Sequence, residues 1–430
     1  MTVAFYTLGC KVNSYETMSV KEQFEQQGYT IVEHSEKADV YVINTCTVTN
    51  NADAKSRKMI RRMIRKNPEA VVAVMGCYAQ IDPETIETID GVDIIIGTTH
   101  RDQLLSHVER FLKQREQFKT ITDVSKYRVF DDLNVTHFLD QTRAFIKIQD
   151  GCNNFCSYCI IPYARGRVRS RSPEDVIDEA KRLVDNGYKE IVLTGIHTGG
   201  YGQDLDTSSF YDLLVRLSRI YGLKRIRISS IEINELTDDI IKLMADNDTF
   251  ARHLHIPLQS GAHNILKSMR RKYTKEAYLK RINEIRTMLP DIAITTDIIA
   301  GYPGETDADF EEMMRFVKEV GFSEMHVFSY SKRNGTPAAK IKEQINGIIK
   351  SARVNELMRL SDEMHHAYIK DVNDDVHSVL FESSDEHFTY GHASNYLYIK
   401  VNKNLNLHNQ LKEVVIIKNT LNGIYGKIIS

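Results

Sequence analysis

The sequence has no tryptophan, only six cysteines and eight prolines among 430 residues, and a formal net charge of −2. It lacks any run of about 18 uncharged apolar residues, which excludes a membrane-spanning helix. The first residues, MTVAFYTLGC, contain neither a basic nor a long apolar segment, so we expect no signal peptide, a cytoplasmic location and no membrane partner. In a reducing compartment, clustered cysteines indicate ligands or catalysts more than disulfides.

Residues 1–110 alternate short apolar runs with amphipathic stretches, as expected of one domain in a chain of this length. Helical patterns at 14–27 and 54–66 separate the apolar runs, an order typical of an open parallel sheet with crossover helices. Residues 111–142 are weakly periodic and are predicted as a linker with one hairpin. The predicted strands are TVAFYTLGC, ADVYVINTC, AVVAVMGC and GVDIIIGTT.

Residues 143–370 repeat a strand–helix pattern six times and end in a charged helical stretch, 342–371. Six such units predict a full or partial (β/α) barrel with its chemistry on the loops after the strands. Residues 371–430 contain five short strands separated by turn residues, which predicts a small all-β barrel or sandwich. The predicted fold class is therefore α/β with a small all-β domain. The barrel strands are predicted at 144–148, 190–194, 225–229, 253–257, 293–298 and 325–329.

Half of the cysteines lie in one loop, DGCNNFCSYC, as Cys152, Cys156 and Cys159. A structural zinc site needs four closed ligands, and no fourth cysteine or histidine is nearby. A [4Fe–4S] cluster held by three thiolates instead leaves one iron open for S-adenosylmethionine, whose C–S bond an added electron can break. Three unrelated buried thiols are the alternative, which the spacing directly after a predicted strand disfavours.

With these cysteines, the chain resembles the radical S-adenosylmethionine superfamily. Five further motifs resemble its methylthiotransferase branch, and the β-rich end resembles a TRAM domain, so that the likeness covers essentially the whole chain. The resemblance implies a partial barrel of the radical type and places Tyr158 near the adenine. The motifs are LTGIHTGGYG, RISSIEINEL, HLHIPLQSGAHNILKSMRRKY, DIIAGYPGET and HVFSYSKRNGTPA.

The other cysteines, Cys10, Cys46 and Cys77, each lie at the carboxyl end of a predicted parallel strand, where ligand sites of open α/β sheets form. Ordinary buried thiols are the alternative. The resemblance implies a second [4Fe–4S] cluster on these three, which holds the sulfur to be transferred, while a second S-adenosylmethionine donates the methyl group. We therefore expect no catalytic His–Asp or Ser–His pair beyond the cluster ligands.

Several loop residues after the barrel strands are candidates for binding S-adenosylmethionine. Each of them could instead only satisfy loop backbone. His253 and His255 share a strand face, but no third histidine is placed to complete a metal site, so a core or pocket role is expected. The candidates, besides Tyr158, are Gly195, Ser229, Ser230, Glu232, Gln259 and Ser260.

A tRNA anticodon stem-loop is the predicted macromolecular partner. Seven basic and no acidic residues lie between Lys55 and Lys66, and further basic groups follow the third cysteine and the fourth barrel strand. A solvated helix is the alternative for such a run. Phe388, Tyr390, Tyr396 and Tyr398 could stack unpaired bases. The predicted phosphate-contacting residues are Arg57, Arg61, Arg65, Arg165, Arg167, Arg270 and Arg271.

The segment TLGCKVNSYET resembles the group that acts on N6-threonylcarbamoyladenosine at tRNA position 37. The isopentenyladenosine-directed group typically shows GCQMN and the ribosomal-protein-directed group GCPKN, and both remain alternatives. Lys11 and Asn13 are candidates for contacting the modified base, although Asn13 could only cap a helix that begins near Ser14. An external one-electron donor, such as a flavodoxin or ferredoxin, and a sulfur source are implied. A non-enzymatic, metal-dependent RNA-binding protein is the alternative from another class.

Overall fold

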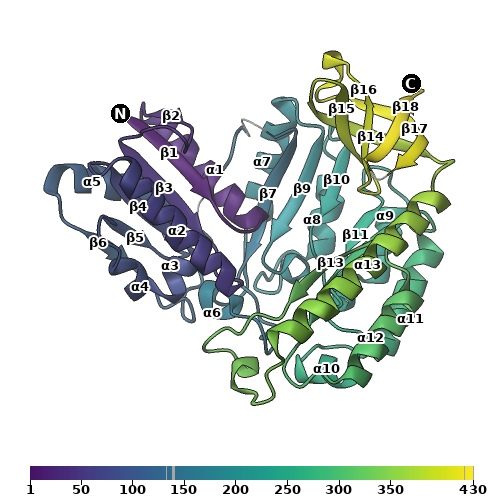
Figure 1. Ribbon diagram of the computed structural model, residues 1–430. Coiled ribbons are helices and arrows are strands. Elements are labelled where there is room, and N and C mark those ends of the chain that lie inside the picture. Colours follow the sequence, from purple (N-terminus) through teal and green to yellow (C-terminus); the bar gives the residue numbers. More distant parts are fainter. Residues whose placement is uncertain (132, 138–140, 421, 430) are drawn as a thin grey trace.

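The computed structural model describes residues 1–131, 133–137, 141–420 and 422–429. It contains an N-terminal α/β sheet, a central barrel-like set of parallel strands and a closed C-terminal β-barrel (Figure 1). These are the fold class and order of parts that the sequence predicts. None of the described helices combines the length and the apolar character that a membrane span needs.

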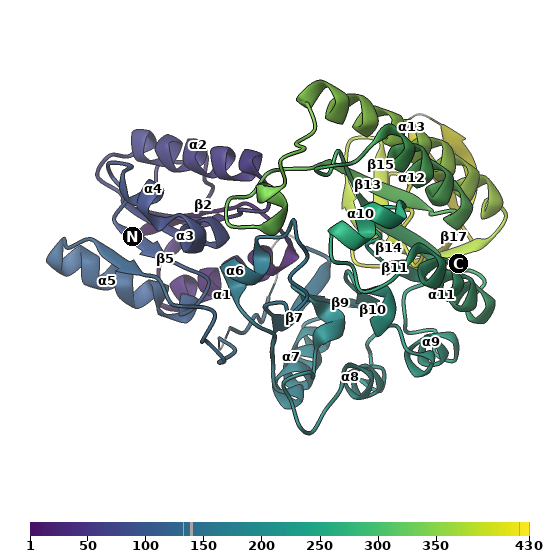
Figure 2. The same cartoon turned by 90° about the horizontal axis from the view of Figure 1, so that it is seen from below.

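The N-terminal sheet has six parallel strands in the order β2-β1-β3-β4-β5-β6. Helices cover both of its faces, so β3 and β4 are buried along their whole length. Figure 2 shows α2 and α4 on one side of this sheet and α1 and α5 on the other. The strands are β1 (Thr2–Thr7), β2 (Thr30–Val32), β3 (Val40–Thr45), β4 (Val71–Gly76), β5 (Ile94–Ile96) and β6 (Phe118–Thr120). The helices are α1 (Lys11–Gln26), α2 (Asn50–Lys66), α3 (Cys77–Ile81), α4 (Pro83–Glu87), η1 (Arg101–Gln103) and α5 (Leu104–Gln114).

The sequence patterns do not reveal β2 and β6, each of three residues, and β6 lies in the stretch predicted as a linker with a hairpin. Helix α1 begins at Lys11, three residues before the predicted start. Helix α2 begins after Thr49, whose side chain accepts a hydrogen bond from the Ala52 amide and satisfies one free N–H of the first turn.

The central part consists of two sheets, β10-β9-β7-β8 and β11-β12-β13, between which the isolated bridge Ile226–Phe250 and a hydrogen bond from the Ile231 amide to the His255 carbonyl lie. Apart from β8, all pairings within them are parallel. The strands are β7 (Arg143–Asp150), β8 (Arg169–Ser170), β9 (Glu190–Gly195), β10 (Arg225–Ile228), β11 (His253–His255), β12 (Ala293–Ala300) and β13 (Glu324–Ser329). The helices are α6 (Ile161–Arg165), α7 (Pro173–Asp185), η2 (Thr198–Gly200), α8 (Phe210–Leu217), η3 (Ile233–Glu235), α9 (Asp238–Ala245), α10 (His263–Ser268), α11 (Lys275–Met288), α12 (Asp307–Val320), η4 (Pro337–Lys340) and α13 (Gly347–Asp371).

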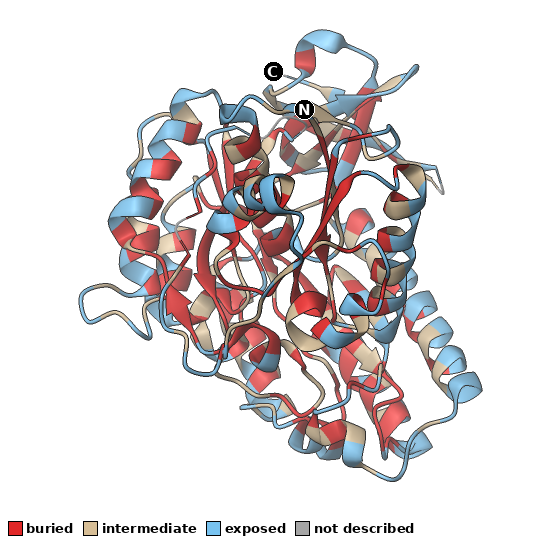
Figure 3. Ribbon diagram, turned by 90° about the vertical axis from the view of Figure 1, so that its left-hand side faces the viewer, coloured by how far each residue is buried: buried red, intermediate tan, exposed pale blue. Residues whose placement is uncertain are grey.

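One large apolar core lies between these strands and the surrounding helices, and Figure 3 shows the buried strands inside half-exposed helices. Along each strand, apolar side chains face the helices and alternate with residues that face the interior of the barrel. On β7, for example, Ile146 and Ile148 belong to the core, whereas Lys147 does not. The interior of the barrel is consequently polar.

The C-terminal barrel closes in the order β14-β15-β16-β18-β17. It contacts the amino ends of β7, β9 and β10, at the opposite end of these strands from α6 (Figure 1). Arg225 donates to the Ser378 carbonyl at 2.7 Å, and Arg143 pairs with Glu382 at 2.8 Å. The elements are β14 (Val376–Ser384), β15 (Phe388–Ala393), β16 (Tyr398–Asn402), η5 (Leu405–Leu407), β17 (Leu411–Thr420) and β18 (Gly423–Ile428).

Candidate active site

The loop after β7 carries Cys152, Cys156 and Cys159 at the carboxyl end of the strand, as predicted. The turn into this loop requires glycine at position 151, where φ is +73° and a Cβ would lie 1.9 Å from the Arg167 carbonyl oxygen. Burial raises the pKa of the Cys159 thiol, and Cys156 and Cys152 raise it further, because the three thiols lie close together. Ligand thiols must lose their protons when metal binds.

Cys10, Cys46 and Cys77 are brought together although they are far apart in the sequence. They follow β1, β3 and β4, which are adjacent in the sheet. Gly9 has φ +122°, and a Cβ there would lie 3.2 Å from the Cβ of Cys46. Burial raises the pKa of Cys77 to about 12, Arg165 opposes this, and Cys46 and Cys10 add to it. The second thiol set therefore gathers at the carboxyl ends of three adjacent strands.

The prediction that Arg165 contacts RNA is wrong, because this side chain is completely buried. It links the barrel to the N-terminal domain: its Nε donates to the Cys77 Sγ at 3.2 Å, and its Nη1 donates to Glu16 at 2.8 Å and to Asp150 at 3.1 Å. Its Nη2 donates to the Asn13 side-chain oxygen at 2.8 Å. Arg165 thus joins one thiol set to the strand that leads into the other.

Asn13 also differs from its prediction. It is buried, and its amide donates to the carbonyl oxygens of Leu8 at 2.8 Å and Thr45 at 3.1 Å. Its side chain is used in holding the loop of Cys10 and does not face an RNA. Nor does it cap α1, whose N-cap is Cys10.

A buried ionic network surrounds Arg165. The carboxylates of Glu16 and Asp150 each contact several cations at 2.6–3.6 Å, and the side chains of these two residues are at most 2% exposed. The attraction of Arg101, Arg165 and Lys147 outweighs burial and lowers the pKa of Glu16 to about 2. The cations are Arg101, Lys147, Arg165 and Arg169, and the carboxylates are Glu16, Asp131 and Asp150.

This network holds one more positive than negative charge, and an unbalanced buried charge is costly. The Cys77 sulfur can supply the missing negative charge, since it already accepts a hydrogen bond from Arg165. A thiolate at Cys77, as in a metal-bound ligand, would balance the network. The donor set therefore fits a thiolate-held cluster.

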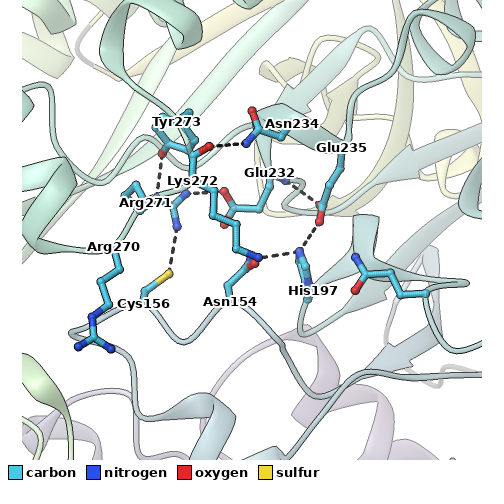
Figure 4. Close-up of a pocket in the computed structure, with 11 residues that line it drawn as sticks. Asn154, Cys156, His197, Glu232, Asn234, Glu235, Arg270, Arg271, Lys272 and Tyr273 are labelled. Carbon is cyan, nitrogen blue, oxygen red and sulfur yellow. Dashed lines mark hydrogen bonds and ion pairs between the residues drawn. The ribbon is translucent and has the colours of Figure 1, made fainter.

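A pocket of about 200 Å³ lies beside Cys156 (Figure 4). Arg271 donates to the Cys156 sulfur at 3.4 Å and pairs with Glu232, so that both side chains point into the same recess. The prediction that Arg271 contacts RNA is therefore wrong, since its side chain is only 3% exposed. Glu232 lines the pocket as a cofactor candidate, but its carboxylate is already paired.

Sequence reasoning missed His197, which lies in the same pocket between Asn154 and Glu235 (Figure 4). Burial lowers the pKa of His197, but hydrogen bonding to Cys152 and Glu235 outweighs burial and raises it to about 10. The histidine comes from the loop after β9 and Glu235 from the loop after β10. A polar residue directly after a predicted barrel strand was the only available signal.

A second pocket, of about 260 Å³, lies beside Cys159 of the thiol loop. It is lined by two predicted cofactor residues, Tyr158 and Gln259, together with Cys159, Asp297 and the N-terminal domain's Thr49. Gln259 has φ +70°, a backbone conformation that side-chain-bearing residues rarely adopt and that often marks a functional constraint.

The remaining cofactor candidates differ in whether their side chains are free to contact a ligand. The Ser229 hydroxyl is buried without a hydrogen-bond partner among the described residues, which leaves it free for a ligand. Gly195 closely approaches Gln149, whose oxygen would lie 3.0 Å from an added Cβ. Ser260 is wrong as a ligand contact, because it is fully buried and its hydroxyl accepts from the Ala262 amide. Ser230 is exposed and lines neither of the two pockets.

The other basic candidates are accessible to different degrees. Arg61, Arg65, Arg167 and Arg270 are exposed, as a phosphate-contacting role requires. Arg57 is half-buried and donates to the Tyr78 hydroxyl at 2.8 Å. The exposed arginines of α2 therefore remain candidates for RNA contact.

A histidine–aspartate pair also lies on neighbouring strands of the barrel, and the expectation that no such pair is catalytic stays a prediction. His255 Nε2 is 3.3 Å from Asp297, and His253 and His255 both contact the Thr295 hydroxyl at 2.9 Å. The two histidines thus share one hydroxyl. Among the described residues, no three His, Cys, Asp or Glu side chains are arranged so that they could hold a metal ion.

Two family models match the chain: the radical SAM superfamily over residues 146–317 and the uncharacterized protein family UPF0004 over residues 2–97. A solved radical S-adenosylmethionine methyltransferase, TsrM from Kitasatospora setae, has a similar fold, with a TM-score of 0.57 at 14% identity over 78% of this chain and 76% of that one. The barrel and the loop after β7 thus define a radical S-adenosylmethionine enzyme.

Curated relatives narrow the class. The threonylcarbamoyladenosine tRNA methylthiotransferase MtaB of Bacillus subtilis (strain 168) is 48% identical over 97% of this chain and 94% of its own length. MtaB of Aquifex aeolicus (strain VF5) is 39% identical over 89% and 94%. A tRNA-2-methylthio-N(6)-dimethylallyladenosine synthase of Carboxydothermus hydrogenoformans is 35% identical over 98% of both chains. The chain belongs to the MtaB-type family of radical S-adenosylmethionine methylthiotransferases.

The cofactors of this enzyme are S-adenosylmethionine and two [4Fe–4S] clusters. The described residues fit them in three respects: two sets of three free thiols at strand ends, a charge network that lacks one anion beside Cys77, and an unpartnered hydroxyl at Ser229. The family and the geometry therefore agree.

Proposed function

We propose that this enzyme adds a methylthio group to C2 of N6-threonylcarbamoyladenosine at position 37 of tRNA. The observation that carries the proposal is the 48% identity, over nearly the full length of both chains, to a protein named for this substrate. The segment GCKVN around Cys10 supports the same subtype. Relatives named for dimethylallyladenosine, at 35–38% identity, make that base the second candidate.

We assign the radical-generating cluster to Cys152, Cys156 and Cys159 and the auxiliary cluster to Cys10, Cys46 and Cys77. When bound, the two clusters and S-adenosylmethionine supply a one-electron radical source and the sulfur and methyl group that are transferred. Tyr158 and Gln259 would hold the adenosyl part in the pocket that they line, and the free Ser229 hydroxyl would donate to the same molecule. Each assignment is supported by position at the carboxyl ends of parallel strands.

The protein's own side chains would position the reactants. Arg165 and Asp150 connect the two thiol sets through a buried network, so that the separation between the sets is fixed before substrate arrives. Arg333 reinforces this arrangement, because it reaches from the barrel to Asp53 at 2.7 Å and to Thr47 at 2.7 Å. The two halves would thus act as one rigid frame around the target base.

The anticodon stem-loop would contact the exposed arginines of α2, with Arg167 and Arg270 beside the radical site. Phosphate contacts of this kind provide affinity without sequence selectivity. An external one-electron donor, such as a flavodoxin or ferredoxin, and a sulfur source complete the proposal, which places the reaction in the cytoplasm.

The test uses the anaerobically reconstituted enzyme with dithionite, sulfide and S-adenosylmethionine. Two anticodon stem-loops, one bearing threonylcarbamoyladenosine and the other isopentenyladenosine, compete in one reaction, and nucleosides are measured by mass spectrometry. We expect the methylthio product from the first RNA in large excess. Equal conversion of both RNAs, or preference for the second, would overturn the substrate assignment.

A further inference from the structure

The C-terminal barrel places the turn between β15 and β16 against the amino ends of the central strands. Arg227 on β10 donates to the carbonyl oxygens of Ala393 and Ser394, both at 3.1 Å. The Ser394 hydroxyl also accepts from the Arg252 amide at 2.9 Å. The turn is therefore held rigidly by the barrel, and its next aromatic residue, Tyr396, is fixed in place.

Tyr396 lies where the two barrels meet. Its φ of +74° is disfavoured for a residue with a Cβ, so the surrounding contacts must hold it there. The ring stacks on His253 with a centroid distance of 4.6 Å, and the guanidinium carbons of Arg227 and Arg143 lie 4.9 and 5.8 Å from its centroid. His253 is only 5% exposed, and its Nδ1 is buried without a hydrogen-bond partner among the described residues.

A fourth residue reaches this place from the N-terminal domain. Lys11, directly after Cys10, interacts electrostatically with Tyr396, Arg143, Arg227 and the carboxylate of Glu190. It is accessible to solvent, yet surrounded by groups from all three parts of the molecule. Its ammonium has no hydrogen-bond or ion-pair partner among the described residues. Lys11, Arg143, Arg227 and Tyr396 are together called the junction site.

The charges around the junction site do not balance. Glu190 pairs with Arg225 at 2.9 Å and with Arg227 at 2.7 Å, and Glu382 pairs with Arg143 at 2.8 Å. Two carboxylates therefore face the cations of Lys11, Arg143, Arg225 and Arg227. Burial, followed by the charge of Arg227, holds the pKa of His253 well below its usual range, so that this histidine adds no charge. The remaining positive charge favours an anionic ligand.

We propose that the junction site binds the carboxylate that ends the threonylcarbamoyl substituent. This inference rests on the proposed function and deepens it by naming the residues that choose the substrate. Lys11 follows a proposed ligand of the auxiliary cluster, so a base whose C2 edge lies beside that cluster would extend its N6 substituent toward the amino ends of the barrel strands. The three unpaired N–H donors of Lys11 would contact the carboxylate, and Arg143 and Arg227 would add to the local positive field.

An RNA phosphate is the other source of an anion with this chemistry. The half-buried tyrosine ring and the buried histidine favour a small, partly apolar ligand over a backbone phosphate, which is strongly hydrated. A site built to bind a polar group rejects an analogue without that group, because its own donors are left unpaired. An isopentenyl group would leave Lys11 unpaired in this way.

The experiment measures binding of reconstituted, cluster-loaded enzyme without S-adenosylmethionine, by fluorescence anisotropy, so that it does not depend on turnover. Three stem-loops of identical sequence carry threonylcarbamoyladenosine, its carboxyl methyl ester or unmodified adenosine. We expect wild type to bind the acid roughly 10- to 100-fold more tightly than the ester, the range for one charged hydrogen bond. Lys11→Gln should lose this preference, and Lys11→Arg should retain most of it.

Lys113→Gln is the matched control, because Lys113 is also an exposed lysine without a recorded partner and should change nothing. Iron content and visible spectrum are checked for each variant, since Lys11 adjoins Cys10. If Lys11→Gln weakens all three RNAs equally, the lysine contacts phosphate and the proposal fails. An unchanged preference for the acid also overturns it. Failure of the proposed function is recognised separately, as absence of methylthio product from wild type.

Discussion

Cys152, Cys156 and Cys159 come from a single loop after β7, whereas Cys10, Cys46 and Cys77 come from the ends of three different strands. One strand, β7, and the loop that follows it are enough to position the three cysteines of the first set. The second needs the order β1-β3-β4 within the sheet, and it is further held by Arg165 from the other domain. Similar chemistry therefore depends on local sequence in one case and on tertiary structure in the other.

The largest effect is expected from removing the loop set. Replacing Cys152, Cys156 and Cys159 by alanine should abolish cleavage of S-adenosylmethionine and leave about half of the iron, as one of two four-iron clusters remains. Production of 5′-deoxyadenosine is measured by chromatography after dithionite reduction. If the variant still forms it, the radical site has been assigned to the wrong thiols.

Removing the strand-end set should separate the two functions. The triple alanine variant of Cys10, Cys46 and Cys77 should still cleave S-adenosylmethionine but form no methylthio product, because the sulfur-holding ligands are gone. Both products are quantified in one assay, with the loop variant as the matched comparison. Wild-type amounts of methylthiolated nucleoside would instead reduce these cysteines to packing residues.

Arg165→Gln tests how far the second set depends on the other domain. Breaking a buried charge network by removing one partner destabilises a protein by roughly 3–5 kcal/mol. We expect a lower denaturant midpoint and also a changed reduction potential of the auxiliary cluster alone, since Cys77 loses its hydrogen bond.

Arg171→Gln serves as its control. Arg171 forms a buried pair with Glu179 but donates to no thiol. It should lower the denaturant midpoint without a change in the potential of either cluster. Equal shifts of the auxiliary potential in both variants would show that Arg165 acts only through general stability.

A pH series should detect two buried ionic networks in cluster-free protein, that of Glu16 with Arg165 and that of Glu190 with Arg227. Ion pairs outweigh burial and lower the pKa of Glu16 and of Glu190 from 4.5 to about 2. Each carboxylate therefore contributes stability that is fully present above about pH 4.5 and is lost as the pH falls toward 2, up to about 3 kcal/mol per group. The difference between wild type and Glu16→Gln should shrink over this range.

Glu190→Gln should show the same pH dependence, because its ion pairs are equally buried. After cluster reconstitution, however, Glu16→Gln should disturb the auxiliary cluster more than Glu190→Gln, because Glu16 pairs with Arg165, which donates to the Cys77 sulfur. Unfolding midpoints that differ from wild type by a constant amount at all pH values would contradict the lowered pKa of either group.

The smallest effect concerns RNA affinity, which neither thiol set determines. Changing the exposed Arg61 and Arg65 to glutamine should weaken tRNA binding and reduce the slope of log affinity against log salt by about 1–2, because each phosphate contact contributes ~0.9. Lys113→Gln again provides the control. An unchanged slope would indicate that α2 is only a solvated helix.

Local patterns in the sequence were sufficient for the strands that carry function. The apolar runs before Cys10, Cys46, Cys77 and Cys152 are strands, because burial on both faces leaves a continuous hydrophobic signal. Strands β2 and β6, of three residues each, gave no such signal. The five C-terminal strands were recognised from their turn residues.

Charge was the least reliable guide. Arg165 and Arg271 looked like members of a basic surface, yet both are buried beside thiols and carboxylates. The sequence alone does not distinguish an arginine that binds an RNA phosphate from one that pairs with a carboxylate of another domain. His197 lies in a loop, and Tyr396 lies in a turn of the C-terminal barrel that packs against the central strands. The periodicity of apolar residues predicts strands and helices but not the positions of such loop residues.

The sequence by itself determined the order of strands and helices along the chain and the loop that carries three cysteines. Through its motifs it also determined the family. The three cysteines of the C-x-x-x-C-x-x-C motif lie in one loop, so no contact between distant segments is needed to bring their side chains together. Only the tertiary structure decided that Cys77 accepts a hydrogen bond from Arg165, and that Lys11 lies within electrostatic range of Arg143 and Tyr396. These contacts join segments more than 80 residues apart, and they exist because sheet order and domain packing, rather than local preference, bring their backbones together.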